Sequence, residues 1–168
     1  MTALPAIIAI TMNTGTGRGA KPMTLAADQV GCASAQIHSL LSRLAHLADE
    51  GELSEYLDLF TPDAVWEMRE AAPTGAAAQR RVGRDDIAAG VVERRASGMQ
   101  GPGTATRHVL TTVDVQVQSA DEAGSVAYWM FFRDTDAVPQ LTAMGRYDDV
   151  VRRTAEGWRL AHRVIRVG

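Results

Sequence analysis

The first strong pattern along the chain is a helical repeat of apolar positions. Hydrophobic side chains recur every three or four residues over 34–48, which predicts an amphipathic helix. Ser34 is a candidate N-cap, and Gly51 predicts the end of the helix in the left-handed geometry that glycine adopts freely. Residues 52–60 have the same spacing and predict a second, short helix. The repeated apolar positions are Ile37, Leu40, Leu41, Leu44, Leu47 and Ala48.

The next segment predicts a turn followed by a strand. Residues 61–63 read Thr-Pro-Asp, and proline cannot continue a helix but favours a turn. Residues 64–70 are rich in strand formers and predict a strand. The Ala-rich stretch 71–81 reads as a loop, and 85–96 as a third helix.

The C-terminal half has the alternating pattern of strands. Over 106–118, apolar and polar residues alternate strongly, so a single strand with two distinct faces is predicted. One face would carry Val109, Thr111, Val113, Val115 and Val117, and the other His108, Leu110, Thr112, Asp114 and Gln116. Further strands are predicted over 125–135, 141–153 and 158–167, which makes an antiparallel meander. Helices first and a meander afterwards predict an α+β fold, with three helices packed on one face of a curved sheet.

Composition narrows the classes of function. The chain has 168 residues, 46% hydrophobic and 22% charged, which suits one domain. The net charge is −3 and no large basic block exists, so a nucleic-acid partner is not expected. The arginine pairs Arg80–Arg81 and Arg94–Arg95 are interpreted as solvated surface. One cysteine, Cys32, excludes an internal disulfide, and the four histidines lack metal-ligand spacing, so no metal and no cofactor are expected.

The N-terminal region is weakly patterned. Residues 4–12 are apolar, but the run is too short to span a membrane and lacks a preceding positive segment. We therefore expect residues 1–33 to be a flexible extension rather than a signal peptide, with the folded domain over 34–168. A cytoplasmic protein without a membrane partner fits this reading.

Asp49 and His108 are the candidate catalytic pair. Asp49 closes the first predicted helix on its apolar side, and His108 opens the first long strand. A carboxylate that holds an imidazole makes a compact general base. Two other readings stay open: Asp49 as a solvated helix-end residue, and His108 as a residue on a pocket rim.

Three motifs carry a family resemblance. The run from Asp49 to Trp66, D-x-G-x-L-x-x-Y-L-x-L-F-T-P-D-A-V-W in outline, resembles the opening of SnoaL-like proteins in the nuclear transport factor 2-like superfamily. The stretches G-R-Y-D-D at 145–149 and G-W-R-L-A-H-R at 157–163 extend the resemblance, which covers about 36–167. It implies a cystatin-like, cone-shaped curved antiparallel sheet wrapped around a pocket, and a homodimer formed through the outer sheet face.

The resemblance also implies the site. In dehydratase-like relatives an aspartate at this helix end and a histidine at this strand start form a catalytic dyad, which matches Asp49 and His108. The chain departs from scytalone-dehydratase-like members, because Ala48 stands where they carry a tyrosine and the strand 125–135 has no second histidine. The expected substrate-binding residues are Tyr56, Trp66, Trp129 and Tyr147.

Two classes of function follow from this site. The first is a cofactor-independent lyase or isomerase that acts on a small apolar or aromatic molecule. The second is a non-catalytic apolar-ligand-binding protein, or an accessory subunit resembling the small subunit of ring-hydroxylating dioxygenases.

Overall fold

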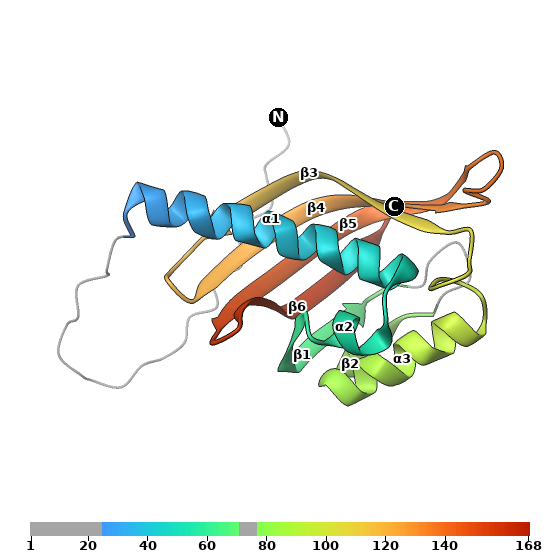
Figure 1. The fold of residues 1–168 in the computed structure, drawn as a ribbon, viewed down its shortest axis with the longest axis horizontal. Coiled ribbons are helices and arrows are strands. Elements are labelled where there is room, and N and C mark those ends of the chain that lie inside the picture. Colours follow the sequence, from blue (N-terminus) through green and yellow to red (C-terminus); the bar gives the residue numbers. More distant parts are fainter. Residues whose placement is uncertain (1–24, 71–76) are drawn as a thin grey trace.

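A long helix lies across one face of a curved sheet, and two shorter helices lie near one end of that sheet (Figure 1). The structure is a computed structural model that describes residues 25–70 and 77–168. The helices are α1 (Ala27–Glu50), α2 (Leu53–Leu57) and α3 (Arg84–Ala96). The strands are β1 (Phe60–Met68), β2 (Gln79–Val82), β3 (Arg107–Val117), β4 (Glu122–Arg133), β5 (Gln140–Thr154) and β6 (Gly157–Val167).

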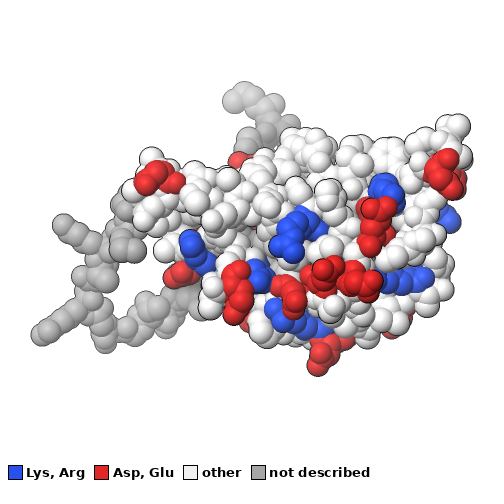
Figure 2. Space-filling view, in the orientation of Figure 1, with Lys and Arg blue, Asp and Glu red and all other residues white. Residues whose placement is uncertain are grey.

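The predicted α+β class and the antiparallel meander are confirmed. The six strands form one sheet in the order β2-β1-β6-β5-β4-β3, so the last four strands are neighbours in chain order. The pairing of β1 with β6 is parallel, whereas the other four pairings are antiparallel. Acidic and basic side chains are interspersed over the face that carries the helices (Figure 2).

Helix α1 differs from its prediction at both ends. It begins at Ala27, within the range predicted as an extension, so Ser34 is an internal residue rather than the N-cap. The amide of Ala26 donates to Oε1 of Gln29 at 3.1 Å, which gives the early helix start a local partner. At the other end, Gly51 has an extended conformation, with φ −87°, so the predicted left-handed cap is wrong. A Cβ at Gly51 would lie 2.7 Å from the Cα of Leu47, and this close approach explains the glycine.

The predicted turn at 61–63 is part of β1. The pairing of β1 with β6 is irregular between Phe60 and Val65, and Pro62 lies inside that irregularity. Its missing N–H therefore costs no ladder hydrogen bond, which is how a strand tolerates proline. The predicted loop 71–81 contains β2 at its end, and residues 71–76 lie outside the described residues.

A β-bulge at Thr112 divides β3 into two parts. The pairing with β4 shifts register there, and Thr112 has φ 52°. Before the bulge, His108 and Leu110 face the cavity of the molecule while Val109 is exposed. After it, the inward positions change, and the predicted single valine face is wrong. The positions packed on the core beyond the bulge are Val113, Val115 and Val117.

The core joins α1 to the inner face of the sheet. Ile37, Leu41 and Leu44 of α1 are buried in one cluster with Phe60 of β1 and Leu160 of β6. This packing fixes the C-terminal end of α1 over the sheet, which determines where Asp49 points. Within the described residues, no helix combines the length and the apolar character that crossing a membrane requires.

Candidate active site

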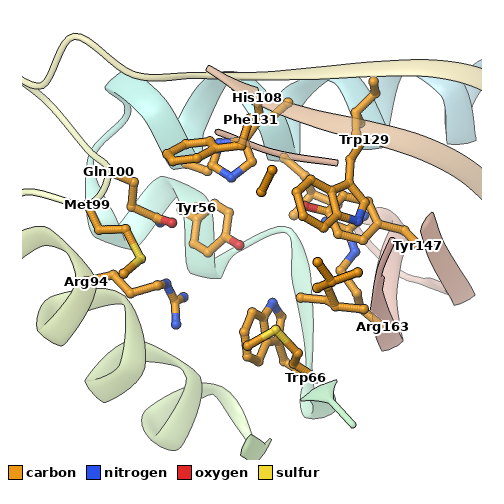
Figure 3. A pocket seen from close by; sticks show the side chains of 18 of the residues that line it. Tyr56, Trp66, Arg94, Met99, Gln100, His108, Trp129, Phe131, Tyr147 and Arg163 are labelled. Atoms are coloured by element: carbon orange, nitrogen blue, oxygen red, sulfur yellow. The ribbon is translucent and has the colours of Figure 1, made fainter. Parts of the chain in front are cut away.

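A cavity of about 250 Å³ lies between the helices and the inner face of the sheet (Figure 3). Helices α1, α2 and α3 contribute to its walls, together with strands from both halves of the sheet. Apolar side chains, both aliphatic and aromatic, make up most of the lining, so the cavity suits an apolar or aromatic molecule. Its volume is near the lower end of the roughly 300–1,000 Å³ typical of ligand pockets, which favours a compact ligand.

Asp49 and His108 are in direct contact. Oδ1 of Asp49 lies 2.6 Å from Nδ1 of His108, and Oδ2 accepts a hydrogen bond of 2.7 Å from the His108 backbone N–H. Asp49 is buried with 3% exposure and does not line the cavity, whereas His108 does. The aspartate therefore lies behind the histidine and fixes both its backbone and its ring.

This contact determines which ring nitrogen is free. A carboxylate only accepts hydrogen bonds, so Nδ1 of His108 carries a proton and donates a hydrogen bond to Asp49. Nε2 is left with a lone pair, and the ring projects into the cavity (Figure 3). Phe131 packs against the ring at 4.7 Å between centroids. The arrangement can accept a proton from a molecule in the cavity.

The four predicted substrate-binding residues all line the same cavity: Tyr56, Trp66, Trp129 and Tyr147. Trp129 and Tyr147 stack with their centroids 5.6 Å apart. Burial raises the pKa of Tyr56 and of Tyr147 above the ordinary tyrosine value. Both hydroxyls therefore stay protonated near neutral pH and can donate to an oxygen of a ligand.

Sequence reasoning missed a buried ion pair in the cavity wall. Arg163 of β6 donates from Nε and Nη2 to the two carboxylate oxygens of Asp149 of β5, at 2.8 and 2.7 Å. Its guanidinium also stacks on the ring of Tyr147, 3.9 Å from the centroid. Burial disfavours the charge, but Asp149 overcomes this and holds the pKa of Arg163 above its ordinary value. Asp149 is the last residue of the motif at 145–149, and Arg163 is the last residue of the motif at 157–163. Both motifs had been interpreted only as signatures of the fold.

The sequence predicted that Arg94 and Arg95 are solvated surface residues. This prediction is wrong, because both side chains are half-buried. Arg94 lines the cavity, and Arg95 donates to the backbone oxygen of Gly51 at 2.8 Å. The spacing of Ile87, Val91 and Arg94 would have revealed the first of these, because positions i, i+4 and i+7 share one face of a helix.

In the other predicted surface pair, only Arg80 fits the prediction. Arg80 is exposed, but Arg81 is half-buried and forms ion pairs with Asp86 and Glu93 of α3, at 3.2 and 2.5 Å. In the ranges 25–70 and 77–168, no three histidine, cysteine, aspartate or glutamate side chains gather in a way that could hold a metal ion.

The fold, with its helices over one face of a curved sheet, is that of the nuclear transport factor 2-like, cystatin-like class. A family model described as SnoaL-like domain matches residues 32–164. The chain therefore belongs to the SnoaL-like family, as the three motifs had indicated. No curated protein matches the chain.

Solved structures with this fold come from several bacterial proteins. An NTF2-like protein with a cystatin-like fold from Novosphingobium aromaticivorans has a TM-score of 0.69 at 21% identity, covering 83% of this chain and 84% of that one. A candidate scytalone dehydratase from the same organism has a TM-score of 0.67 at 17% identity, covering 85% and 89%.

A third structure from Novosphingobium aromaticivorans is the beta subunit of a candidate aromatic-ring-hydroxylating dioxygenase. Its TM-score is 0.66 at 20% identity, covering 82% of this chain and 90% of that one. At these identities the similarities show a shared fold, and the reaction must be argued from the site itself.

Proposed function

We propose that the protein is a cofactor-independent lyase or isomerase that removes a proton from a small apolar or aromatic substrate. The observation that carries the proposal is the double contact of Asp49 with His108, which leaves Nε2 free at the wall of an aromatic cavity. A base held in one tautomer inside an apolar pocket is suited to proton abstraction next to a carbonyl group.

The reaction would proceed in two steps. Nε2 of His108 takes a proton from the carbon beside a carbonyl, and Asp49 stabilises the imidazolium that forms. The electron pair moves to the carbonyl oxygen, where the hydroxyl of Tyr56 or Tyr147 can donate a hydrogen bond. In an isomerase the imidazolium returns the proton to another carbon. In a lyase the electron pair returns from the oxygen and expels a leaving group at the next carbon, and the imidazolium gives its proton to that departing group.

The second candidate is a binding protein or an accessory subunit. The structural similarity to a dioxygenase beta subunit favours it, because that protein has the same fold and is named as one component of a larger enzyme. Under this alternative the cavity would hold an apolar ligand without turnover, and His108 would serve only to position that ligand.

A homodimer through the outer sheet face is part of the proposal. Val109, Met130 and Met144 are register partners across β3, β4 and β5, and they form an apolar row on the face opposite the cavity. Tyr128 lies on the same face and is 50% exposed. An apolar row of this kind favours a partner sheet.

The base-promoted ring opening of 5-nitrobenzisoxazole tests the base without knowledge of the natural substrate. A base removes the ring C–H proton, the N–O bond breaks, and a cyanophenolate forms that absorbs visible light. We expect the protein to accelerate this opening and His108→Ala to lose the acceleration by about 100-fold or more.

The chain offers a matched control for this variant. His162 lies outside the cavity and pairs with Glu67, 3.2 Å from Nε2 to Oε1. His162→Ala should leave the ring opening unchanged. Equal rates for the wild type and His108→Ala would contradict the general-base proposal and favour the binding protein.

A further inference from the structure

Arg94 reaches the cavity from α3. Its guanidinium carbon lies 4.8 Å from the centroid of the Trp66 ring, and the side chain lines the cavity together with the neighbouring Met99 and Gln100. Figure 3 shows these three residues on one side of the cavity, and His108 projecting from another. The cation is therefore part of the ligand site and lies apart from the proposed base.

The charge of Arg94 is not matched by the protein. Among the residues that the structure describes, no carboxylate lies within 4.0 Å of its guanidinium, and the guanidinium donates no hydrogen bond. The contrast with Arg163 is direct, because that arginine has both oxygens of Asp149. Residues 1–24 and 71–76 contain no aspartate or glutamate that could supply the missing charge.

A second arginine, Arg81, lies beside Arg94. A Cβ built on Gly90 would lie 3.1 Å from Nε of Arg81 and 3.3 Å from Nη1 of Arg94, so both guanidinium groups approach this glycine. Arg81 is neutralised by Asp86 and Glu93. Among the described residues, Arg94 is left as a half-buried cation with no carboxylate in direct contact, which costs free energy unless an anion binds beside it.

We propose that the ligand of this cavity carries a carboxylate group, and that Arg94 binds it. A guanidinium presents a planar pair of donors that matches the two oxygens of a carboxylate. A phenol fits less well, because its pKa near 10 keeps it neutral at neutral pH. The inference rests on the proposed function in using the same cavity, and it narrows the ligand to a compact aromatic or alicyclic acid.

The position of Arg94 also orients the ligand. The carboxylate would lie against α3 beside Trp66, and the remainder of the molecule would extend among the aromatic side chains toward His108. The carbon that loses its proton is then at the opposite end of the molecule from the carboxylate. Gln100, buried beside Arg94, can donate a further hydrogen bond to the same group.

Isothermal titration calorimetry with two matched probes tests this inference. The probes are 2-naphthoate and its neutral analogue 2-naphthamide, which have nearly the same shape. We expect the wild type to bind the naphthoate at least about tenfold more tightly, and Arg94→Met to reduce that preference to within about twofold. The wild-type comparison needs no variant and by itself overturns the inference if the naphthamide binds equally well.

Arg153 provides the control variant. It also lies over a tryptophan, 6.0 Å from the centroid of the Trp158 ring, but it does not line the cavity. Arg153→Met should keep the full preference for the naphthoate, and Arg94→Met keeping it as well would overturn the inference. Because binding is measured without turnover, the result does not depend on His108. A wild type that prefers the naphthoate but does not accelerate the ring opening of 5-nitrobenzisoxazole would contradict the proposed function and leave this inference intact.

Discussion

Asp149 and Arg163 face each other as direct register partners on β5 and β6, and their side chains form a buried bidentate ion pair. The guanidinium plane covers the ring of Tyr147, so the pair supports one wall of the cavity. Side-chain exposure is 6% for the arginine and 1% for the aspartate. The two charges are therefore almost completely removed from water and depend on each other.

Removing one partner of this pair should be costly. Asp149→Ala leaves Arg163 as a buried cation, and we expect the free energy of unfolding to fall by about 3–5 kcal/mol. Urea denaturation followed by circular dichroism measures this. Asp148→Ala is the control, because its ion pairs with Arg146 and Arg166 are partly exposed, and such pairs are worth about 0–1 kcal/mol. Equal decreases in the free energy of unfolding for the two variants would show that the buried ion pair contributes no more to stability than the partly exposed one.

Asp49→Asn should impair the base while preserving much of the fold. The asparagine can present an N–H to the ring, which favours the tautomer with the proton on Nε2 and removes the free lone pair. We expect the ring opening of 5-nitrobenzisoxazole to slow by about 100-fold.

Glu67→Gln makes the equivalent change at His162 outside the cavity, and its rate should equal that of the wild type. A wild-type rate for Asp49→Asn would mean that the aspartate does not determine the tautomer of the His108 ring.

The fold was largely predictable from the sequence because its signals are local. The repeat in α1 and the alternation in β4–β6 are properties of adjacent residues. The parallel pairing of β1 with β6 was not predictable in the same way, because 97 residues separate the partners Val65 and His162. The bulge at Thr112 left no trace either, since neither glycine nor proline marks it.

Tyr147 should make the protein sensitive to alkaline pH. Its pKa is raised by burial in the folded state and is near 10 in the unfolded chain. Above pH 10 the unfolded state loses the proton while the folded state keeps it, so the free energy of unfolding falls by up to about 1.4 kcal/mol for each pH unit.

Urea denaturation between pH 8 and pH 11 checks this prediction. Tyr147→Phe should flatten the decline above pH 10, although Tyr56 contributes a decline of the same sign. An unchanged slope in the variant would show that Tyr147 does not titrate differently in the two states.

The outer apolar row predicts a dimer that a single charge disrupts. Met144 is 49% exposed and lies in register with Met130, so Met144→Glu places a carboxylate within the proposed interface. We expect the wild type to sediment as a dimer and the variant as a monomer. Val138→Glu, at a residue 78% exposed in the turn between β4 and β5, should not change the mass. A monomeric wild type would contradict the dimer.

The site was predictable only in part. Asp49 and His108 came from a motif and a resemblance, and the structure brings their side chains together. Whether they act as a base is what the variants test. Arg94 and Arg163 were missed because long polar side chains are usually solvated, and only the packing of α3 and β6 shows that these two reach the cavity.

The bulge at Thr112 separates β3 into a half that lines the cavity and a half that packs on the core. His108 and Leu110, before the bulge, line the cavity, and the valines after it pack on the core. Without the bulge, the five-residue separation of His108 and Val113 would put them on opposite faces of a regular strand, so keeping the valines inside would turn His108 to the solvent side, away from Asp49. The extra residue therefore lets the reactive half and the packing half of β3 face inward together, which an ordinary alternating strand with this spacing cannot do.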